Sequence, residues 1–153
     1  MAAVFQFGKY ACPMSEIFHT TALSHCIVNL KPVVPGHVLI LPQRVVRKLR
    51  DLTDEECTDL FLTTKRVIAF IEKYHQVDSV TVAVQDGPNA GQTVDHVHVH
   101  ILPRKPGDFQ NNDDIYREIE KDDRRARTEE EMAAEASALR ASFEAHLAQA
   151  VPA

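Results

Sequence analysis

The chain has 153 residues, the length of a single domain that is large enough to bury one hydrophobic core. Hydrophobic residues make up 44% and charged residues 25%, which excludes a disordered or fibrous protein. The formal net charge of -5 argues against a general nucleic-acid binder with a basic surface, so an anionic ligand would need a local positive site.

Cys12, Cys26 and Cys57 are too few and too irregularly spaced for a disulfide framework or a metal cluster. The N-terminus lacks a basic region followed by an apolar run, and no apolar stretch reaches the roughly 18 residues that span a bilayer. We therefore expect reduced thiols, no membrane partner and a cytoplasmic protein, with the nucleus as an alternative location.

Strands are predicted in the first part of the chain from short alternating or apolar segments. Residues 4–7 and 16–20 predict a hairpin-like start, and residues 24–30 and 37–41 predict two stronger strands. A rigid turn, Lys31-Pro-Val-Val-Pro-Gly36, separates the last two, because two prolines and a glycine restrict its backbone.

A long amphipathic helix is predicted from Thr53 to about residue 75. Glu56 follows Thr53 by three positions, which is the spacing of a capping box. The apolar residues that follow recur at helical spacing: Cys57, Leu60, Phe61, Val67, Ile68, Ile71 and Tyr74. A second helix is predicted over about residues 128–149, with Thr128 and Glu131 at its start.

The remaining segments complete an α+β domain. Residues 79–85 and 95–102 predict two further strands around a loop at 86–92, and residues 110–127 are expected to form a mobile charged segment. The chain is therefore expected to be one domain over 1–153, with its core at about 3–109. Its predicted architecture is a five-stranded antiparallel sheet with two main helices.

Three histidines alternate with valines at His96-Val97-His98-Val99-His100. On a strand, alternate side chains share one face, and neighbouring histidine Cα atoms would lie about 6.6 Å apart. Such a row could follow a polyphosphate, and imidazole can act near pH 7 as a neutral nucleophile, a base or a cation. The spacing therefore favours phosphate chemistry.

Two other interpretations of this row are a solvated sheet face and a zinc site. A solvated face rarely draws the same uncommon residue three times in succession. Two of the histidines could bind zinc with His37 or Asp95, since imidazole is a common zinc ligand. All three, however, would span about 13 Å on a regular strand and could not reach one ion at about 2.0–2.1 Å. We therefore expect no metal held by the protein alone.

The loop before the histidines contains residues that could donate to phosphate oxygens without bringing a full charge. These residues are Gly87, Gly91, Gln92 and Thr93. A simple hairpin turn at Asp86-Gly87-Pro88 is the alternative interpretation. His37, which follows Pro35-Gly36, would fix the tautomer of a neighbouring histidine if the two strands lie side by side.

The row and the two residues after it, Ile101-Leu102, resemble the histidine-triad pattern His-x-His-x-His-x-x, in which x is apolar. Within that superfamily the chain is similar to the fragile-histidine-triad (Fhit) branch of dinucleoside triphosphate hydrolases. The matching segments cover most of the chain: Lys31-Pro-Val-Val-Pro-Gly-His37-Val-Leu, Gln85-Asp-Gly-Pro, Ala90-Gly-Gln-Thr-Val, Leu102-Pro-Arg-Lys, Gly107-Asp-Phe, Asn112-Asp, Ile115-Tyr116 and 129–136.

This resemblance implies a HIT-like fold whose homodimer joins two five-stranded sheets into one. It implies hydrolysis of diadenosine polyphosphates, with the triphosphate preferred and cleaved to AMP and ADP, and signalling by the dinucleotide-bound complex. Hydrolysis of nucleoside phosphoramidates, or nucleotide binding with slow turnover, is the alternative. A divalent cation, Mg²⁺ or Mn²⁺, would arrive with the polyphosphate, and no organic cofactor is implied.

The resemblance also implies roles for single residues. His98 would be the nucleophile that carries the adenylyl group, with its other ring nitrogen donating to a backbone carbonyl. His96 and His100 would flank it, His100 stabilising the departing oxygen when protonated, and His37 would support them. Asn29 would meet the ribose, and the phosphate side would be lined by Gln85, Gly91, Gln92, Thr93 and Val94. Tyr10 stands where animal members carry a histidine near the substrate.

Overall fold

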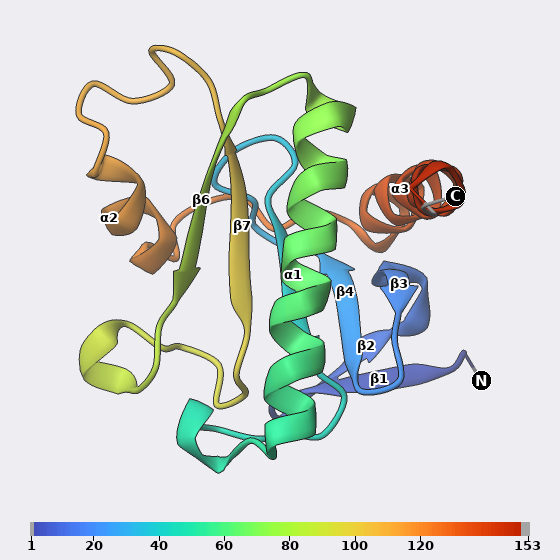
Figure 1. Ribbon diagram of the computed structural model, residues 1–153. Coiled ribbons are helices and arrows are strands. Elements are labelled where there is room, and N and C mark those ends of the chain that lie inside the picture. The colour runs from blue at the N-terminus through green and yellow to red at the C-terminus, as the bar shows by residue number, and fades with distance from the viewer. Residues whose placement is uncertain (1, 151–153) are drawn as a thin grey trace.

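A five-stranded antiparallel sheet forms the centre of the computed structural model, which describes residues 2–150 (Figure 1). Its strands follow the order β3 (Ile17–Thr20), β4 (Ser24–Val28), β5 (Val38–Pro42), β7 (Val99–Arg104) and β6 (Ser79–Val84). A separate hairpin consists of β1 (Val4–Phe7) and β2 (Tyr10–Pro13). The helices are α1 (Asp54–His75), α2 (Asp114–Glu120) and α3 (Glu129–Gln149).

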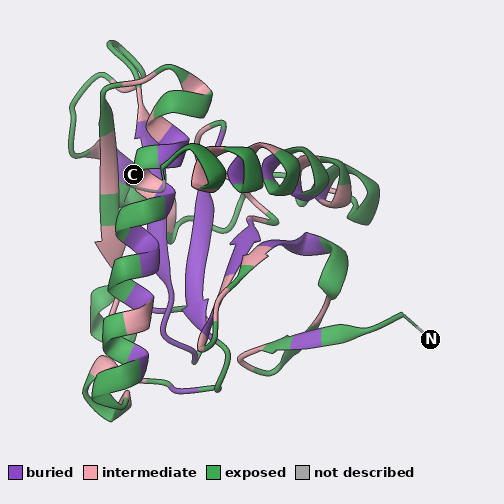
Figure 2. Cartoon of the chain, turned by 45° about the vertical axis from the view of Figure 1, so that its right-hand side comes forward, coloured by how far each residue is buried: buried purple, intermediate pink, exposed green. Residues whose placement is uncertain are grey.

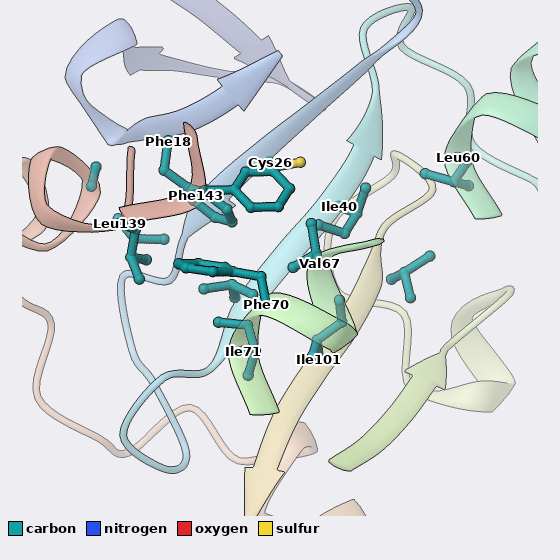
Figure 3. Close-up of a cluster of buried hydrophobic side chains, with 14 of the residues drawn as sticks. Phe18, Cys26, Ile40, Leu60, Val67, Phe70, Ile71, Ile101, Leu139 and Phe143 are labelled. Carbon is teal, nitrogen blue, oxygen red and sulfur yellow. The ribbon is translucent and has the colours of Figure 1, made fainter. Parts of the chain in front are cut away.

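The two long helices, α1 and α3, cover one face of this sheet, and the main core lies between them and the strands (Figures 1 and 3). Phe70 of α1 and Phe143 of α3 meet there, with ring centroids 4.9 Å apart. The strand residues that face them alternate along β4, β5 and β7, as the pleat of a sheet requires: Cys26, Val28, Val38, Ile40, Val99 and Ile101. Figure 2 shows the matching buried stripes along both helices.

The opposite face of the sheet carries a smaller core that is covered by the β1–β2 hairpin. Phe5 of the hairpin packs there against Ile17, Ile27, Leu39 and Leu41. His100 belongs to this face, since it pairs with Leu39 of β5, whose side chain alternates with those of the main core. The sheet therefore separates the helices from the histidines.

The two predicted capping boxes are confirmed. The hydroxyl of Thr53 accepts a hydrogen bond from the Glu56 N–H, and the Glu56 carboxylate accepts one from the Thr53 N–H. Thr128 and Glu131 repeat both bonds at the start of α3. Within residues 2–150, no helix combines the length and the apolar character needed to cross a membrane.

The predicted hairpin-like start was wrong in its pairing. Residues 4–7 do form a strand, but they pair with β2 rather than with residues 16–20. A two-residue turn at Gly8-Lys9 makes this possible, because Gly8 adopts a φ of +58°, in the region that favours glycine. This turn was the sequence signal for β2, which was not predicted.

The strand predicted at 95–102 begins only at Val99, so His96 and His98 precede β7. The register of β5 and β7 ends at the pair Ile40–Val99. Beyond it, Pro42 has no N–H to continue the ladder, and its carbonyl accepts a side-chain hydrogen bond from His96 instead. Two of the three histidines of the row, His96 and His98, therefore lie just outside the sheet, and only His100 lies within it.

The segment predicted to be mobile, 110–127, contains the short helix α2, which the sequence analysis did not predict. Ile115 of α2 is fully buried. The turn after α2 places Arg124 and Arg127 against the backbone that follows β4. Its mobility stays a prediction, but its arginines have defined partners.

We expect Thr53→Ala to lower the free energy of unfolding by about 1 kcal/mol, because the N–H of Glu56 loses its acceptor at the start of α1. Thr58→Ala, on the exposed side of the same helix, is the matched control, and it should be neutral or slightly stabilising. Urea unfolding measures both variants. Equal stability of the two variants would contradict the capping role.

Candidate active site

Four histidines gather on the hairpin side of the sheet, along β5 and the start of β7. His37 directly precedes β5, His100 is the second residue of β7, and His96 and His98 lie in the irregular segment before it. All four are at most 7% exposed. His98 and His100 are neighbours, with ring centroids 4.9 Å apart. The structure thus brings together all four predicted catalytic histidines.

The proton of His98 is placed by the backbone. Its Nδ1 lies 2.7 Å from the carbonyl oxygen of His96, which can only accept, so Nδ1 carries the hydrogen. Nε2 of the neutral ring therefore keeps its lone pair, the state that a nucleophile needs. The predicted bond from the second ring nitrogen to a backbone carbonyl is confirmed. Phe7 lies edge-on to the His98 ring at 5.1 Å.

A second chain of hydrogen bonds places the protons of His37 and His100. The N–H of Val33 donates to Nδ1 of His37 at 3.1 Å, so the proton of the neutral His37 ring is on Nε2. That Nε2–H donates to Nδ1 of His100 at 2.9 Å. The proton of neutral His100 must then be on its Nε2, a buried atom without a hydrogen-bond partner within residues 2–150.

Burial keeps these rings uncharged. Desolvation is the main cause that lowers the pKa of His37 to about 3, and electrostatic repulsion from Arg124, His98 and Arg127 lowers this pKa further. The pKa of His100 is lowered well below the ordinary imidazole value by burial first, and then by His98, His37 and Arg124. Burial also lowers the pKa of His98, although the bond to the His96 carbonyl opposes this. The site therefore presents one acceptor, His98 Nε2, beside one donor, His100 Nε2–H.

His96 differs from the other two histidines of the triad, because both its ring nitrogens are occupied. Its Nδ1 accepts from the N–H of Gly8 at 3.0 Å, and its Nε2–H donates to the carbonyl of Pro42 at 2.8 Å. It thereby joins the β1–β2 hairpin to the end of β5. Neither nitrogen is free for a substrate, so the geometry makes His96 a residue that positions the hairpin and the carbonyl of its own backbone.

The loop predicted to bind phosphate is held in place by Gln92. The Gln92 side chain accepts from the N–H of Gly87 at 2.7 Å and donates to the carbonyl of Arg47 at 2.9 Å. Gly91 has a φ of +90°, and a Cβ there would lie 2.8 Å from the Gln85 amide nitrogen. The loop needs glycine at this position, and the Gln92 amide supports the loop rather than pointing to a ligand.

The other residues predicted to bind the substrate differ in their burial and in their contacts. Asn29 accepts from the N–H of Lys31, and its amide nitrogen lies 3.2 and 3.3 Å from the two nitrogens of His37. Thr93 is exposed, and Val94 is half-buried beside Gly8. Tyr10 is 49% exposed and pairs across the hairpin with Phe7, the residue that contacts His98.

The zinc interpretation finds no matching set of ligands in the part of the chain that the structure describes. No group of three or more His, Cys, Asp or Glu residues there could hold a metal ion. The hydrogen bonds explain why, since His37 and His96 each use both ring nitrogens within the protein.

Sequence reasoning missed three contributors to this site. The N–H of Val33 sets the tautomer of His37, and the pair of arginines, Arg124 and Arg127, lies against the residues after β4. The rigid turn with two prolines was a signal for the first, because such a turn fixes the direction of a backbone N–H. The arginines had no local signal, since they contact residues more than 90 positions away.

The chain matches known proteins over most of its length. The family model of the HIT domain matches residues 13–107. The bis(5'-adenosyl)-triphosphatase of Dictyostelium discoideum is 56% identical over 138 residues, which cover 90% of this chain and 92% of the relative. The bifunctional bis(5'-adenosyl)-triphosphatase/adenylylsulfatase FHIT of Arabidopsis thaliana is 47% identical over 152 residues, covering 92% of this chain and 84% of the relative.

A solved structure agrees with the fold. The crystal structure of the Plasmodium falciparum diadenosine triphosphate hydrolase in complex with Cyclomarin A has a TM-score of 0.80 and 31% identity. The similarity covers 95% of this chain and 87% of that chain. Together with the histidine geometry, these matches show that the chain belongs to the histidine triad (HIT) family and, within it, to the Fhit branch.

Proposed function

We propose that this protein hydrolyses diadenosine polyphosphates and that diadenosine triphosphate, cleaved to AMP and ADP, is its preferred substrate. The observation that carries this proposal is the pair of adjacent imidazoles with fixed and opposite roles. His98 offers a lone pair on Nε2, and His100 offers a proton on Nε2, with the rings 4.9 Å apart. A phosphoanhydride needs both an attacking atom and a donor for the departing oxygen.

In the first step, Nε2 of His98 attacks the α-phosphorus. The bond from nitrogen to phosphorus forms while the bond from phosphorus to the bridging oxygen breaks, and ADP leaves with that oxygen. The His98 ring then carries a positive charge. Its Nδ1–H already donates to the carbonyl of His96, and this bond becomes stronger when the donor is charged.

His100 supplies a hydrogen bond from a neutral ring. If it were protonated on Nδ1, that N–H would face the N–H of His37, and the bond between them would be lost. This differs from the protonated form expected from the sequence. A neutral donor that is already aimed requires no reorganisation when charge develops on the oxygen.

In the second step, the oxygen of water bonds to the phosphorus held on His98, the bond from nitrogen to phosphorus breaks, and AMP leaves while the proton that water loses passes to solvent. Nε2 then regains its lone pair. A divalent cation, Mg²⁺ or Mn²⁺, enters with the polyphosphate as part of the substrate and reduces its charge, since Mg²⁺ in such sites is held mainly by phosphates and water.

The test of this function compares turnover of diadenosine triphosphate with turnover of an adenosine phosphoramidate by the same preparation. The proposal expects the dinucleotide to have the higher kcat/KM. A higher kcat/KM for the phosphoramidate would identify the alternative activity. Binding of the dinucleotide without turnover would identify a nucleotide-binding module.

His98→Ala should reduce kcat by more than the roughly 10²–10³-fold that the loss of one oriented donor typically costs. Affinity for the dinucleotide should change little, because the attack occurs only in the transition state. His100→Ala, which removes the donor, should fall within that smaller range, and His146→Ala on α3 is the control at a distance from the site. A His98→Ala enzyme as active as His100→Ala would remove His98 from the nucleophile role.

We also propose that the protein is a homodimer. β6 is an edge strand that pairs with β7 on one side, and its Val82 is 41% exposed. Pairing of this edge with that of a second copy would extend the sheet and cover an unpaired strand. Light scattering at micromolar concentration should give the mass of two chains, and the mass of one chain would contradict the proposal.

A further inference from the structure

Three consecutive carbonyls after β4 all accept hydrogen bonds from one distant segment. The carbonyl of Asn29 accepts from Nε and Nη2 of Arg127, at 3.1 and 2.6 Å. The carbonyl of Leu30 accepts from the Arg127 N–H at 2.9 Å. The carbonyl of Lys31 accepts from Nε of Arg124 at 3.0 Å. We call Arg124 and Arg127 the arginine clamp.

The clamp is itself held in place. Arg127 also donates to Glu135 of α3 at 2.8 Å, and its side chain is only 16% exposed. Arg124 also donates to the carbonyl of Glu118 at the end of α2. Lys31 binds back to the same segment, since its ammonium donates to the Asp122 carboxylate at 2.6 Å. The clamp therefore ties α2 and α3 to residues 29–31.

The clamped residues lead directly into the histidine relay. Asn29 receives the N–H of Lys31 on its side-chain oxygen and places its amide against His37. Two residues after Lys31, the N–H of Val33 donates to Nδ1 of His37. His37 then sets the tautomer of His100. A shift of residues 29–33 would thus change the direction in which His100 presents its proton.

The clamp also places two positive charges near this relay. The charged and titratable groups that act on His37 are Arg124, His98 and Arg127, and those that act on His100 are His98, His37 and Arg124. A nearby cation disfavours the imidazolium form. The guanidinium group of Arg124 therefore adds to burial in keeping both imidazoles neutral, and that of Arg127 does so for His37.

We propose that Arg124 and Arg127 are positioning residues for hydrolysis, which hold residues 29–31 so that the relay from Val33 through His37 keeps the Nε2–H of His100 aimed at the departing oxygen. The role in turnover rests on the function proposed above. The effect on the two imidazoles does not, and it can be measured in the protein without substrate.

The chain offers a matched control within the clamp segment. Arg125 lies beside Arg124 but points outward, with a side chain that is 69% exposed and an ion pair to Glu131. Arg125→Gln removes the same charge from the same segment without touching residues 29–31. An exposed pair of this kind contributes little to stability, so the control should fold normally.

The variants to compare are Arg124→Gln, Arg127→Lys, and Arg127→Met combined with Glu135→Gln, so that no carboxylate is left without its partner. Thermal unfolding verifies that each variant folds. Arg127→Lys keeps the charge and a single donor nitrogen but loses the planar fork, so it should restore part of what the methionine variant loses.

Proton–nitrogen NMR of the histidine rings reads the effect directly, because it distinguishes the two neutral tautomers from the cation. In the wild type and in Arg125→Gln, His37 and His100 should stay in the Nε2–H form from about pH 8 down to about pH 5. In Arg124→Gln the pKa values of His37 and His100 should rise, in the methionine variant the pKa of His37 should rise, and in both variants the second tautomer of His100 should appear.

The variants whose histidine spectra change should also have a lower kcat. We expect kcat to fall about 10-fold to 100-fold in the clamp variants, as a displaced catalytic group can cost about that much, with KM nearly unchanged. Spectra and kcat equal to those of Arg125→Gln would overturn the proposal. A fall in kcat with unchanged histidine spectra would also overturn it. If the wild type proves inactive on the dinucleotide, the spectra still decide whether the clamp holds the relay.

Discussion

Two backbone groups decide which protons the catalytic imidazoles carry, and the rest of the site depends on them. The carbonyl of His96 takes the proton of His98 Nδ1, and the N–H of Val33 occupies Nδ1 of His37. Backbone groups do not titrate, so these assignments hold wherever the rings remain neutral. The result is a lone pair on Nε2 of His98 and a proton on Nε2 of the neighbouring His100 ring, and within residues 2–150 no charged side chain forms a hydrogen bond with either ring.

The sheet and the turns supply these two backbone groups in different ways. The pairing of β7 with β5 begins only at Val99. The peptide of His96 therefore lies outside the ladder, and its carbonyl can accept the hydrogen bond from His98. A regular strand would have used that carbonyl in a ladder or pointed it along the sheet. At Val33, Pro32 and Pro35 restrict the backbone of the turn, and the Val33 N–H donates to Nδ1 of His37. Burial then lowers the pKa of each ring and keeps the relay uncharged.

Local signals explain what the sequence could predict. The capping boxes at Thr53 and Thr128 involve residues three positions apart, and alternation placed His98 and His100 on one face of the chain. Most of the errors concern partners that are distant in sequence, and the missed strand β2 is the local exception. β2 forms because Gly8 closes a tight turn, and His96 leaves the strand because Pro42 and Gly8 bind its ring. The contacts of the charged run after α2 were not predicted, because the carbonyls that bind Arg124 and Arg127 lie more than 90 residues earlier.

The covalent route requires that His98 attack phosphorus and hold the adenylyl group before water arrives. Hydrolysis of diadenosine triphosphate that is chiral at the α-phosphorus, in heavy-oxygen water, tests it most directly. Two successive in-line displacements predict label in AMP, none in ADP, and retention of configuration at phosphorus. Inversion, or label in ADP, would contradict the covalent route through His98.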